Sequence, residues 1–275
     1  MNQLRTLVDV WRGACADFAA VARSLSDTEW RLPTDLSGWS VGDVVAHCAA
    51  LEAELAGDPP LRVEIDKSAA HIAGPRGIYT ERGVVARRGR TPDHVIAEFE
   101  DAVERRTAML AAEPLDDADA IPAITPGRSG WNWAILLRNR PIDIWVHEQD
   151  VRRAVGKPGD LDTVAAAHVQ GVYGAALPYV VAKAAGAPPG TTVVFDVTGP
   201  LTGLYAVEVT EDHRGRPLAE VPDEPIIRFT LDTETFTMLG AGRRDPSNLP
   251  VRIIAGATAP EGLAARILTS LNVTP

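Results

Sequence analysis

Residues 138–153, RNRPIDIWVHEQDVRR, contain the pattern around which we interpret the rest of the chain. In a helix, Asp143 and His147 lie one turn apart on the same face, because residues four apart are neighbours on a helix surface. A carboxylate and an imidazole at this spacing can bind one metal ion from a rigid element. A third ligand must come from elsewhere. His47 is the best candidate, because it lies in the apolar stripe of another predicted helix.

Pro141 stands just ahead of the two ligand candidates. A proline inside a helix removes a hydrogen bond and produces a kink. Either one kinked helix covers residues 131–155, or a new helix begins near Pro141. Both alternatives leave Asp143 and His147 on one face.

The apolar pattern divides the chain into a helical part and a mixed part. Helical spacing predicts further helices over residues 3–25, 40–56, 91–113 and 163–185. The segments 60–90 and 114–130 lack this periodicity and are predicted to be long loops. After the glycine- and proline-rich residues 186–190, alternation predicts strands over residues 193–197, 204–209, 226–231 and 251–254. A turn is expected at 213–216, and helices are expected after residues 232 and 260.

These elements predict an α+β fold with two domains. Residues 1–187 are expected to form a four-helix bundle that holds the metal site. Residues 188–275 are expected to form a small α+β domain, with the boundary near residue 188.

Composition narrows the function classes. The chain has 275 residues, is 45% hydrophobic and carries a formal net charge of −10, which disfavours a nucleic-acid partner. No apolar run is expected to approach the roughly 18 to 20 residues that a transmembrane helix requires, so we expect no membrane partner. Residues 1–25 mix charged with apolar residues, unlike a signal peptide, and we expect a cytoplasmic protein. Cys15 and Cys48 lie on apolar helix faces and are expected to be buried, reduced thiols.

Four arginines, at positions 82, 87, 88 and 90, form a local basic run in this acidic chain. One interpretation is a solvated surface. The alternative is an anion-binding segment, because the arginine side chain presents a fork of donors that carboxylates accept.

Two histidines and one carboxylate form a common catalytic metal set that leaves coordination positions open. Zinc suits these ligands best, and ferrous or nickel ions also accept them. Such a metal either lowers the pKa of bound water, as in a hydrolase, or holds a thiol as the reactive thiolate. The remaining histidines lack partners at ligand spacing and are expected on the surface or in loops: His71, His94, His168 and His213.

Three segments together resemble the mycothiol-dependent maleylpyruvate isomerase family. Residues 39–47, WSVGDVVAH, resemble the helix that carries the first ligand of the family. Residues 143–152, DIWVHEQDVR, resemble its carboxylate-x-x-x-His motif, and residues 242–275 resemble its small C-terminal domain. The resemblance implies a DinB-like four-helix bundle followed by a small α+β domain of the sterol-carrier type.

The resemblance also implies a divalent metal, usually Zn²⁺, bound by His47, Asp143 and His147. The ligand at position 143 is Asp, one methylene shorter than the Glu of the family pattern. A low-molecular-weight thiol, mycothiol in actinobacteria, would be activated on the metal and would attack a small electrophile. An arginine of the C-terminal domain is expected to serve the isomerase reaction. Arg243 is the candidate catalytic residue, although a structural role in the turn before Asp245 explains it equally well.

Three hypotheses follow. The first is a metal- and mycothiol-dependent isomerase or S-transferase, in which Arg87 and Arg88 bind a carboxylate of the thiol cofactor. Asp150 is then either a partner of a ligand histidine or an ion-pair partner of Arg153. The second is a metal-dependent hydrolase that uses the same three ligands. The third is a non-catalytic protein that binds a small molecule. In each case the partners are small molecules, and the protein is expected to be a monomer or a homodimer.

Overall fold

The computed structural model describes residues 3–274, and the chain divides in sequence into two compact units, with the boundary between Gly159 and Asp160. Each unit is described by itself. Residues 1, 2 and 275, which we assigned to the two predicted domains, lie outside the described residues.

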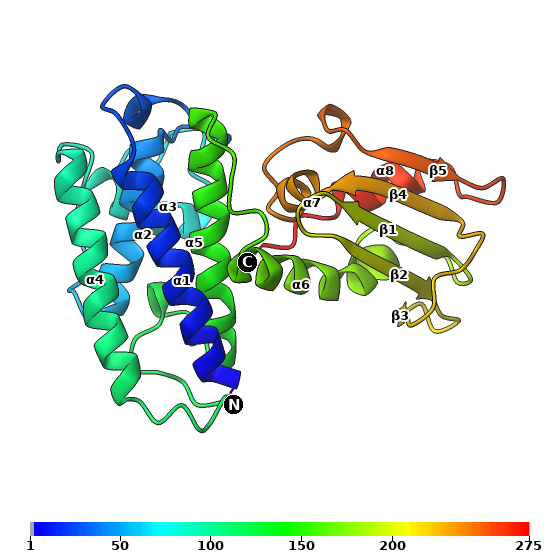
Figure 1. Cartoon of the computed structure of the whole chain (residues 1–275), viewed down its shortest axis with the longest axis horizontal. Helices are drawn as coiled ribbons and strands as arrows, with labels where there is room; N and C mark the ends of the chain where they lie inside the picture. Colours follow the sequence, from blue (N-terminus) through cyan, green and yellow to red (C-terminus); the bar gives the residue numbers. More distant parts are fainter. Residues whose placement is uncertain (1–2, 275) are drawn as a thin grey trace. The chain divides into compact units, whose positions relative to one another are not determined.

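The first unit is a helical bundle (Figure 1). Its helices are α1 (Gln3–Arg23), α2 (Val41–Leu55), α3 (Gly74–Val85), α4 (Pro92–Ala112) and α5 (Trp133–Val155), with short 3₁₀ turns at Glu29–Arg31 and Pro126–Arg128. Helix α1 packs against α4 and α5, and helix α2 packs against α3, α4 and α5. The four long helices, α1, α2, α4 and α5, form the predicted bundle.

Local sequence explains the limits of the two helices that matter for the site. Ser40 caps α2, and Asp43 returns the hydrogen bond to the backbone of Ser40, so that both halves of a capping box form. The side chain of Asn132 caps α5, and Gly156 ends α5 in the left-handed conformation with φ of 67°. Helix α5 continues through Pro141, which confirms a single helix rather than a new start.

Helix α3 lies in a segment that we predicted to be a loop. Its buried residues are only Glu81, Gly83 and Val84, so no apolar stripe signals the helix in the sequence. Gly83 permits a close approach to α2, because an added Cβ would lie 2.5 Å from the Cβ of Ala50.

The second unit is built around a five-stranded sheet with the order β3-β2-β1-β4-β5 (Figure 1). The strands are β1 (Thr192–Thr198), β2 (Gly203–Val209), β3 (Gly215–Leu218), β4 (Ile227–Asp232) and β5 (Arg252–Ala255). Strand β1 pairs antiparallel with β2 and parallel with β4. In the parallel pair, Phe195 of β1 lies opposite Phe229 of β4. Strand β3 occupies part of the predicted turn at 213–216 and pairs with β2. The sequence did not predict this strand, because three of its four residues, Gly215, Arg216 and Pro217, are not typical of strands. The helices are α6 (Val164–Tyr179), which continues into a π-helical turn (Val180–Ala184), α7 (Thr233–Gly240) and α8 (Leu263–Thr269).

Helix α6 belongs to the sheet unit, although we assigned it to the bundle and placed the boundary near residue 188. It packs against β2, β3 and α7. The ring of Tyr173 lies 6.4 Å from that of Phe236, and Gly174 lies so close to Tyr205 that an added Cβ would be 2.3 Å from the ring. Apolar residues show that this helix is buried, but they do not show which partner buries it.

The stretch Val164–Ala184 also corrects the expectation about apolar runs. It is 21 residues long and contains an 18-residue window with a mean hydropathy of 1.2, so by length and composition it could cross a membrane. Half of that window is buried in the structure, and a core helix of a globular domain passes the same test.

Candidate metal centre

The three predicted ligands come together between α2 and α5. One donor atom from each of His47, Asp143 and His147 lies within 4.8 Å of the other two. His47 Nε2 is 3.8 Å from Asp143 Oδ2, and His147 Nε2 is 3.6 Å from Asp143 Oδ1. The two imidazole rings meet edge to face at 4.9 Å between centroids. Sequence spacing alone predicted only that Asp143 and His147 on α5 lie together. The packing of α2 against α5 brings His47 to the same place.

The second nitrogen of His147 is held by a carboxylate. Asp150 Oδ2 lies 3.1 Å from His147 Nδ1, and its Oδ1 accepts a 2.5 Å hydrogen bond from Arg153. Arg153 also donates to Asp35 at 3.2 Å. A proton on Nδ1 facing this carboxylate leaves the lone pair of Nε2 free for a metal. Both alternatives considered for Asp150 are therefore realised together.

Asp143 is fixed by a charged partner one turn earlier on α5. Arg140 donates to Asp143 Oδ2 at 2.8 Å, which leaves Oδ1 on the side of His147. Burial alone would raise the pKa of the Asp143 carboxyl, but Arg140 and the two imidazoles outweigh burial and hold this pKa well below its usual range. The side chain is thus an anionic ligand at neutral pH.

Arg140 is held in turn by Glu52, a fully buried carboxylate on α2. Glu52 Oε1 accepts hydrogen bonds from Arg140 and from Trp11 Nε1, while Oε2 accepts one from Arg106 at 2.6 Å. Burial would raise the pKa of Glu52, but the two guanidinium groups outweigh it and keep this pKa below its usual value. With Asp143, the group contains two carboxylates and two guanidinium groups, so its formal charges cancel.

The other ligand histidine lies against an indole. The rings of Trp39 and His47 are 5.2 Å apart, and Trp39 Nε1 donates a 2.9 Å hydrogen bond to the buried carboxylate of Glu81 on α3. Glu81 also contacts His71 at 3.2 Å and Arg88 at 3.0 Å. Burial lowers the pKa of His47, although Asp143 opposes this, and the neutral imidazole that metals require is favoured.

The donor set fits a divalent metal ion. It offers two imidazole nitrogens and one carboxylate oxygen, with one imidazole oriented by Asp150, and such sets leave positions open for other ligands. Metal binding by His47, Asp143 and His147 stays a prediction.

Both predicted cofactor-binding arginines are engaged with carboxylates of the protein. Arg87 is buried; it forms two hydrogen bonds with Glu98 and donates to the carbonyl of Gly83. Arg88 pairs with Glu81 and with Asp43. Their proposed contact with a cofactor stays a prediction, and it would require these ion pairs to be shared or exchanged.

Arg243 lies just after α7 in the second unit. Its amide donates to the carbonyl of Met238 and its guanidinium to that of Ala241, so it helps to close the end of α7. This is the structural role considered above, and a catalytic role stays a prediction. His71 lies in a loop, as expected, but its side chain is only 20% exposed because it contacts Glu81.

The two cysteines of the chain are buried and free, as predicted. Burial raises the pKa of both thiols well above the usual value, with Glu52 adding to the shift at Cys15 and Asp143 at Cys48. Neither thiol therefore supplies a reactive thiolate at neutral pH.

Sequence reasoning missed Glu52 and Arg140 as parts of the site. Residues 41, 45, 48 and 52 recur at spacings of three and four, so Glu52 lies on the apolar face of α2. A charged residue on such a face needs a buried counter-charge, and Arg140, one turn before Asp143, is placed to provide it. That combination is the signal that could have identified the pair.

Comparison with known proteins identifies the family of the chain. The family model described as the mycothiol maleylpyruvate isomerase N-terminal domain matches residues 11–152, more than half of the chain. The chain belongs to this family. Its fold is similar to crystal structures of the mycothiol-dependent maleylpyruvate isomerase and of a point mutant of that enzyme. The identities are 16% and 15%, the TM-scores are 0.55 and 0.57, and each match covers 94% of this chain and 95% of the other. A search of curated proteins finds no match to the chain.

Proposed function

We propose that this protein is a metal- and thiol-dependent enzyme, an isomerase or S-transferase that acts on a small electrophile. The convergence of His47, Asp143 and His147, with one imidazole fixed by Asp150, is the observation that carries the proposal. Membership of a family named for a mycothiol-dependent isomerase supports mycothiol as the thiol and a small electrophile as the second partner.

A divalent metal held there, with Zn²⁺ as the proposed ion, would lower the pKa of a bound thiol and keep it as the nucleophilic thiolate. The chain contributes the rest of the environment. Asp143 brings one negative charge whose orientation Arg140 fixes, and Asp150 holds the proton of His147 on Nδ1. The two imidazoles are buried, which places them in surroundings of low dielectric constant where electrostatic interactions are stronger than in water.

An external thiol is required because the chain offers no reactive one of its own. Cys15 and Cys48 are fully buried, and the pKa of each is raised. The nucleophile of a thiol-dependent reaction must therefore enter as a small molecule.

Metal content and thiol dependence test the proposal. Protein purified without a histidine tag is expected to hold about one divalent metal per chain, and His147→Ala to hold none. His94→Ala is a matched control, because this histidine lies exposed at the start of α4 and should leave metal content unchanged. Conjugation of an electrophile such as chlorodinitrobenzene is then expected only with mycothiol present. Turnover that is independent of thiol would instead favour the metal-dependent hydrolase, and a metal-free wild type would contradict the proposal.

A further inference from the structure

Within the described part of the chain, three of the four arginines in the basic run, at positions 82, 87, 88 and 90, form ion pairs with carboxylates of the protein, and one does not. Arg87 and Arg90 both pair with Glu98, and Arg88 pairs with the carboxylates described above. Among residues 3–274, the guanidinium of Arg82 has no hydrogen-bond or ion-pair partner, and its side chain is exposed. The one cation of the run that remains available to an external anion is therefore Arg82.

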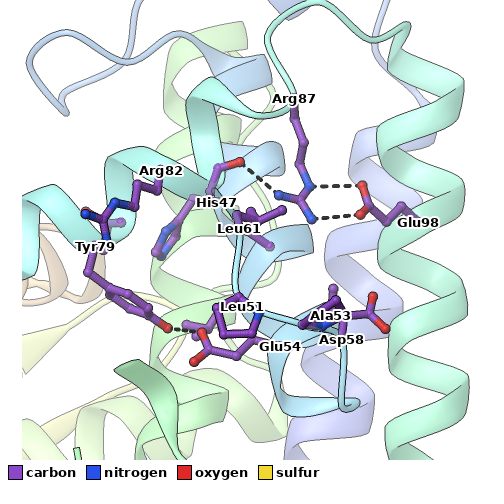
Figure 2. Close-up of a pocket in the computed structure, with 15 residues that line it drawn as sticks. His47, Leu51, Ala53, Glu54, Asp58, Leu61, Tyr79, Arg82, Arg87 and Glu98 are labelled. Atoms are coloured by element: carbon purple, nitrogen blue, oxygen red, sulfur yellow. Dashed lines mark hydrogen bonds and ion pairs between the residues drawn. The ribbon is translucent and has the colours of Figure 1, made fainter. Parts of the chain in front are cut away.

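Arg82 lies on the wall of a pocket that His47 also lines (Figure 2). In this view, Tyr79 and Arg82 of α3 stand on one side, the Arg87–Glu98 pair stands on the other, and His47 lies between them. The free volume is about 250 Å³, below the roughly 300–1,000 Å³ of pockets that hold drug-sized ligands, so its ligand is small.

The interior of the pocket is apolar. Aliphatic and proline side chains of α2 and of the following loop supply most of it: Ala50, Leu51, Ala53, Pro59, Pro60 and Leu61. Burying apolar surface here is favourable by roughly 25 cal/mol per Å². A group rich in hydroxyls gains nothing comparable unless it finds hydrogen-bond partners.

The polar groups on the wall are already engaged. Glu54 accepts hydrogen bonds from the hydroxyl of Tyr79 and the amide of Gly127. Both oxygens of Asp58 accept from Arg105. The pocket therefore favours an apolar body and offers one charged group, Arg82, to a single anion.

We propose that this pocket binds the electrophilic substrate, and that the substrate is a small molecule with an apolar body and one carboxylate, which faces Arg82. Because His47 lines the same pocket, such a molecule lies next to the proposed metal centre. The inference rests on the proposed function and narrows its substrate class. A short dicarboxylate is disfavoured, because it has little apolar surface and a second anion would meet Glu54, Asp58 and Glu98.

Unreactive ligands test the pocket separately from catalysis. By isothermal titration calorimetry, 4-phenylbutyrate is expected to bind, 4-phenylbutanol to bind about two- to fivefold more weakly because it lacks the anion, and succinate not to bind. Arg82→Gln should reduce the affinity for 4-phenylbutyrate to that for the alcohol and leave the alcohol unaffected. Leu61→Asp should weaken both ligands about tenfold or more, because it places a charge against their apolar body.

Two controls separate the possible failures. Ile121→Asp alters another exposed apolar side chain, outside this pocket, and should leave binding unchanged. His147→Ala removes the proposed metal but should keep 4-phenylbutyrate binding. If this variant binds 4-phenylbutyrate, the metal is not the partner of the carboxylate. Absence of 4-phenylbutyrate binding, equal binding of succinate, or insensitivity to both Arg82→Gln and Leu61→Asp would overturn the inference. A metal-free wild type that still binds 4-phenylbutyrate in this pattern would overturn only the proposed function.

Discussion

Neutralising Glu52 is the most informative perturbation of this site, because one buried carboxylate holds two buried guanidinium groups. Arg106 and Arg140 are each only 2% exposed, and Glu52 is fully buried. Glu52→Gln keeps the shape of the side chain, but its NH₂ group would face guanidinium donors, and the formal charge of the group would change from zero to +1. Breaking a buried ion pair by removing one partner costs about 3–5 kcal/mol.

That loss should be visible in unfolding and in metal binding. For a unit of this size, about 2–4 °C in Tm per kcal/mol gives a decrease of roughly 6–20 °C. Among residues 3–274, Asp143 is the only carboxylate besides Glu52 that pairs with Arg140. Without Glu52, Arg140 would compete with a metal for Asp143. We therefore expect the metal affinity to fall about 10- to 100-fold as well.

The measurements are urea unfolding followed by circular dichroism, and metal titration by calorimetry at a temperature at which the variant is folded. Glu104→Gln on α4 provides a matched control, because this carboxylate is exposed, and it should unfold within about 0.5 kcal/mol of the wild type. A Glu52→Gln variant within about 1 kcal/mol of the wild type would refute the reasoning, since its buried arginines would then need no counter-charge.

Three further perturbations test separate parts of the structure. Asp150→Asn removes the charge that orients a ligand imidazole and should lower metal affinity about 10- to 100-fold by calorimetry, while Arg153 keeps its ion pair with Asp35. Gly42→Ala places a Cβ 2.1 Å from the indole nitrogen of Trp30 and should cost about 1–3 kcal/mol in urea unfolding, whereas Gly89→Ala, with nothing within 4 Å, should not. A hydrogen bond from Lys157 lowers the pKa of Glu29 from its usual value of 4.5 to about 2. The stabilising contribution of Glu29 should therefore be present above pH 4.5 and be lost as the pH falls toward 2. NMR titration of this carboxyl checks the last expectation, and an ordinary pKa would contradict it.

Much of the bundle could be predicted because its signals are local. The capping box of Ser40 and Asp43 lies within four residues, and the apolar stripes of the long helices follow directly from their spacing. Helix α3 could not be predicted in this way, because two of its three buried residues are Glu81 and Gly83. Helix α6 was predicted as a helix, but its partner was not, since an apolar surface packs equally well on a bundle or on a sheet.

The site shows the same division between local and long-range information. Asp143 and His147 were paired by their spacing, and His47 was found because a polar ring in an apolar stripe needs a partner. The partners of Arg87 and Arg88 could not be found in this way. Arg88 pairs with Asp43, 45 positions earlier, and Arg87 pairs with Glu98 across the turn into α4. Without knowledge of those contacts, Arg87 and Arg88 were predicted to be available to a carboxylate of the cofactor.

The ion pairs of the run also explain how a basic segment can lie beside the candidate metal centre with little repulsion of a cation. Asp143 is a single carboxylate, and Arg140 already donates a hydrogen bond to one of its oxygens. Further unpaired guanidinium groups near the centre would oppose a divalent ion over distances that water screens poorly inside the bundle. Pairing Arg140 with Glu52 as well as Asp143, and Arg88 with Glu81 and Asp43, reduces that opposition to the single charge of Arg82. The carboxylates around the centre therefore act as counter-charges, and the three convergent ligands are left to determine what binds there.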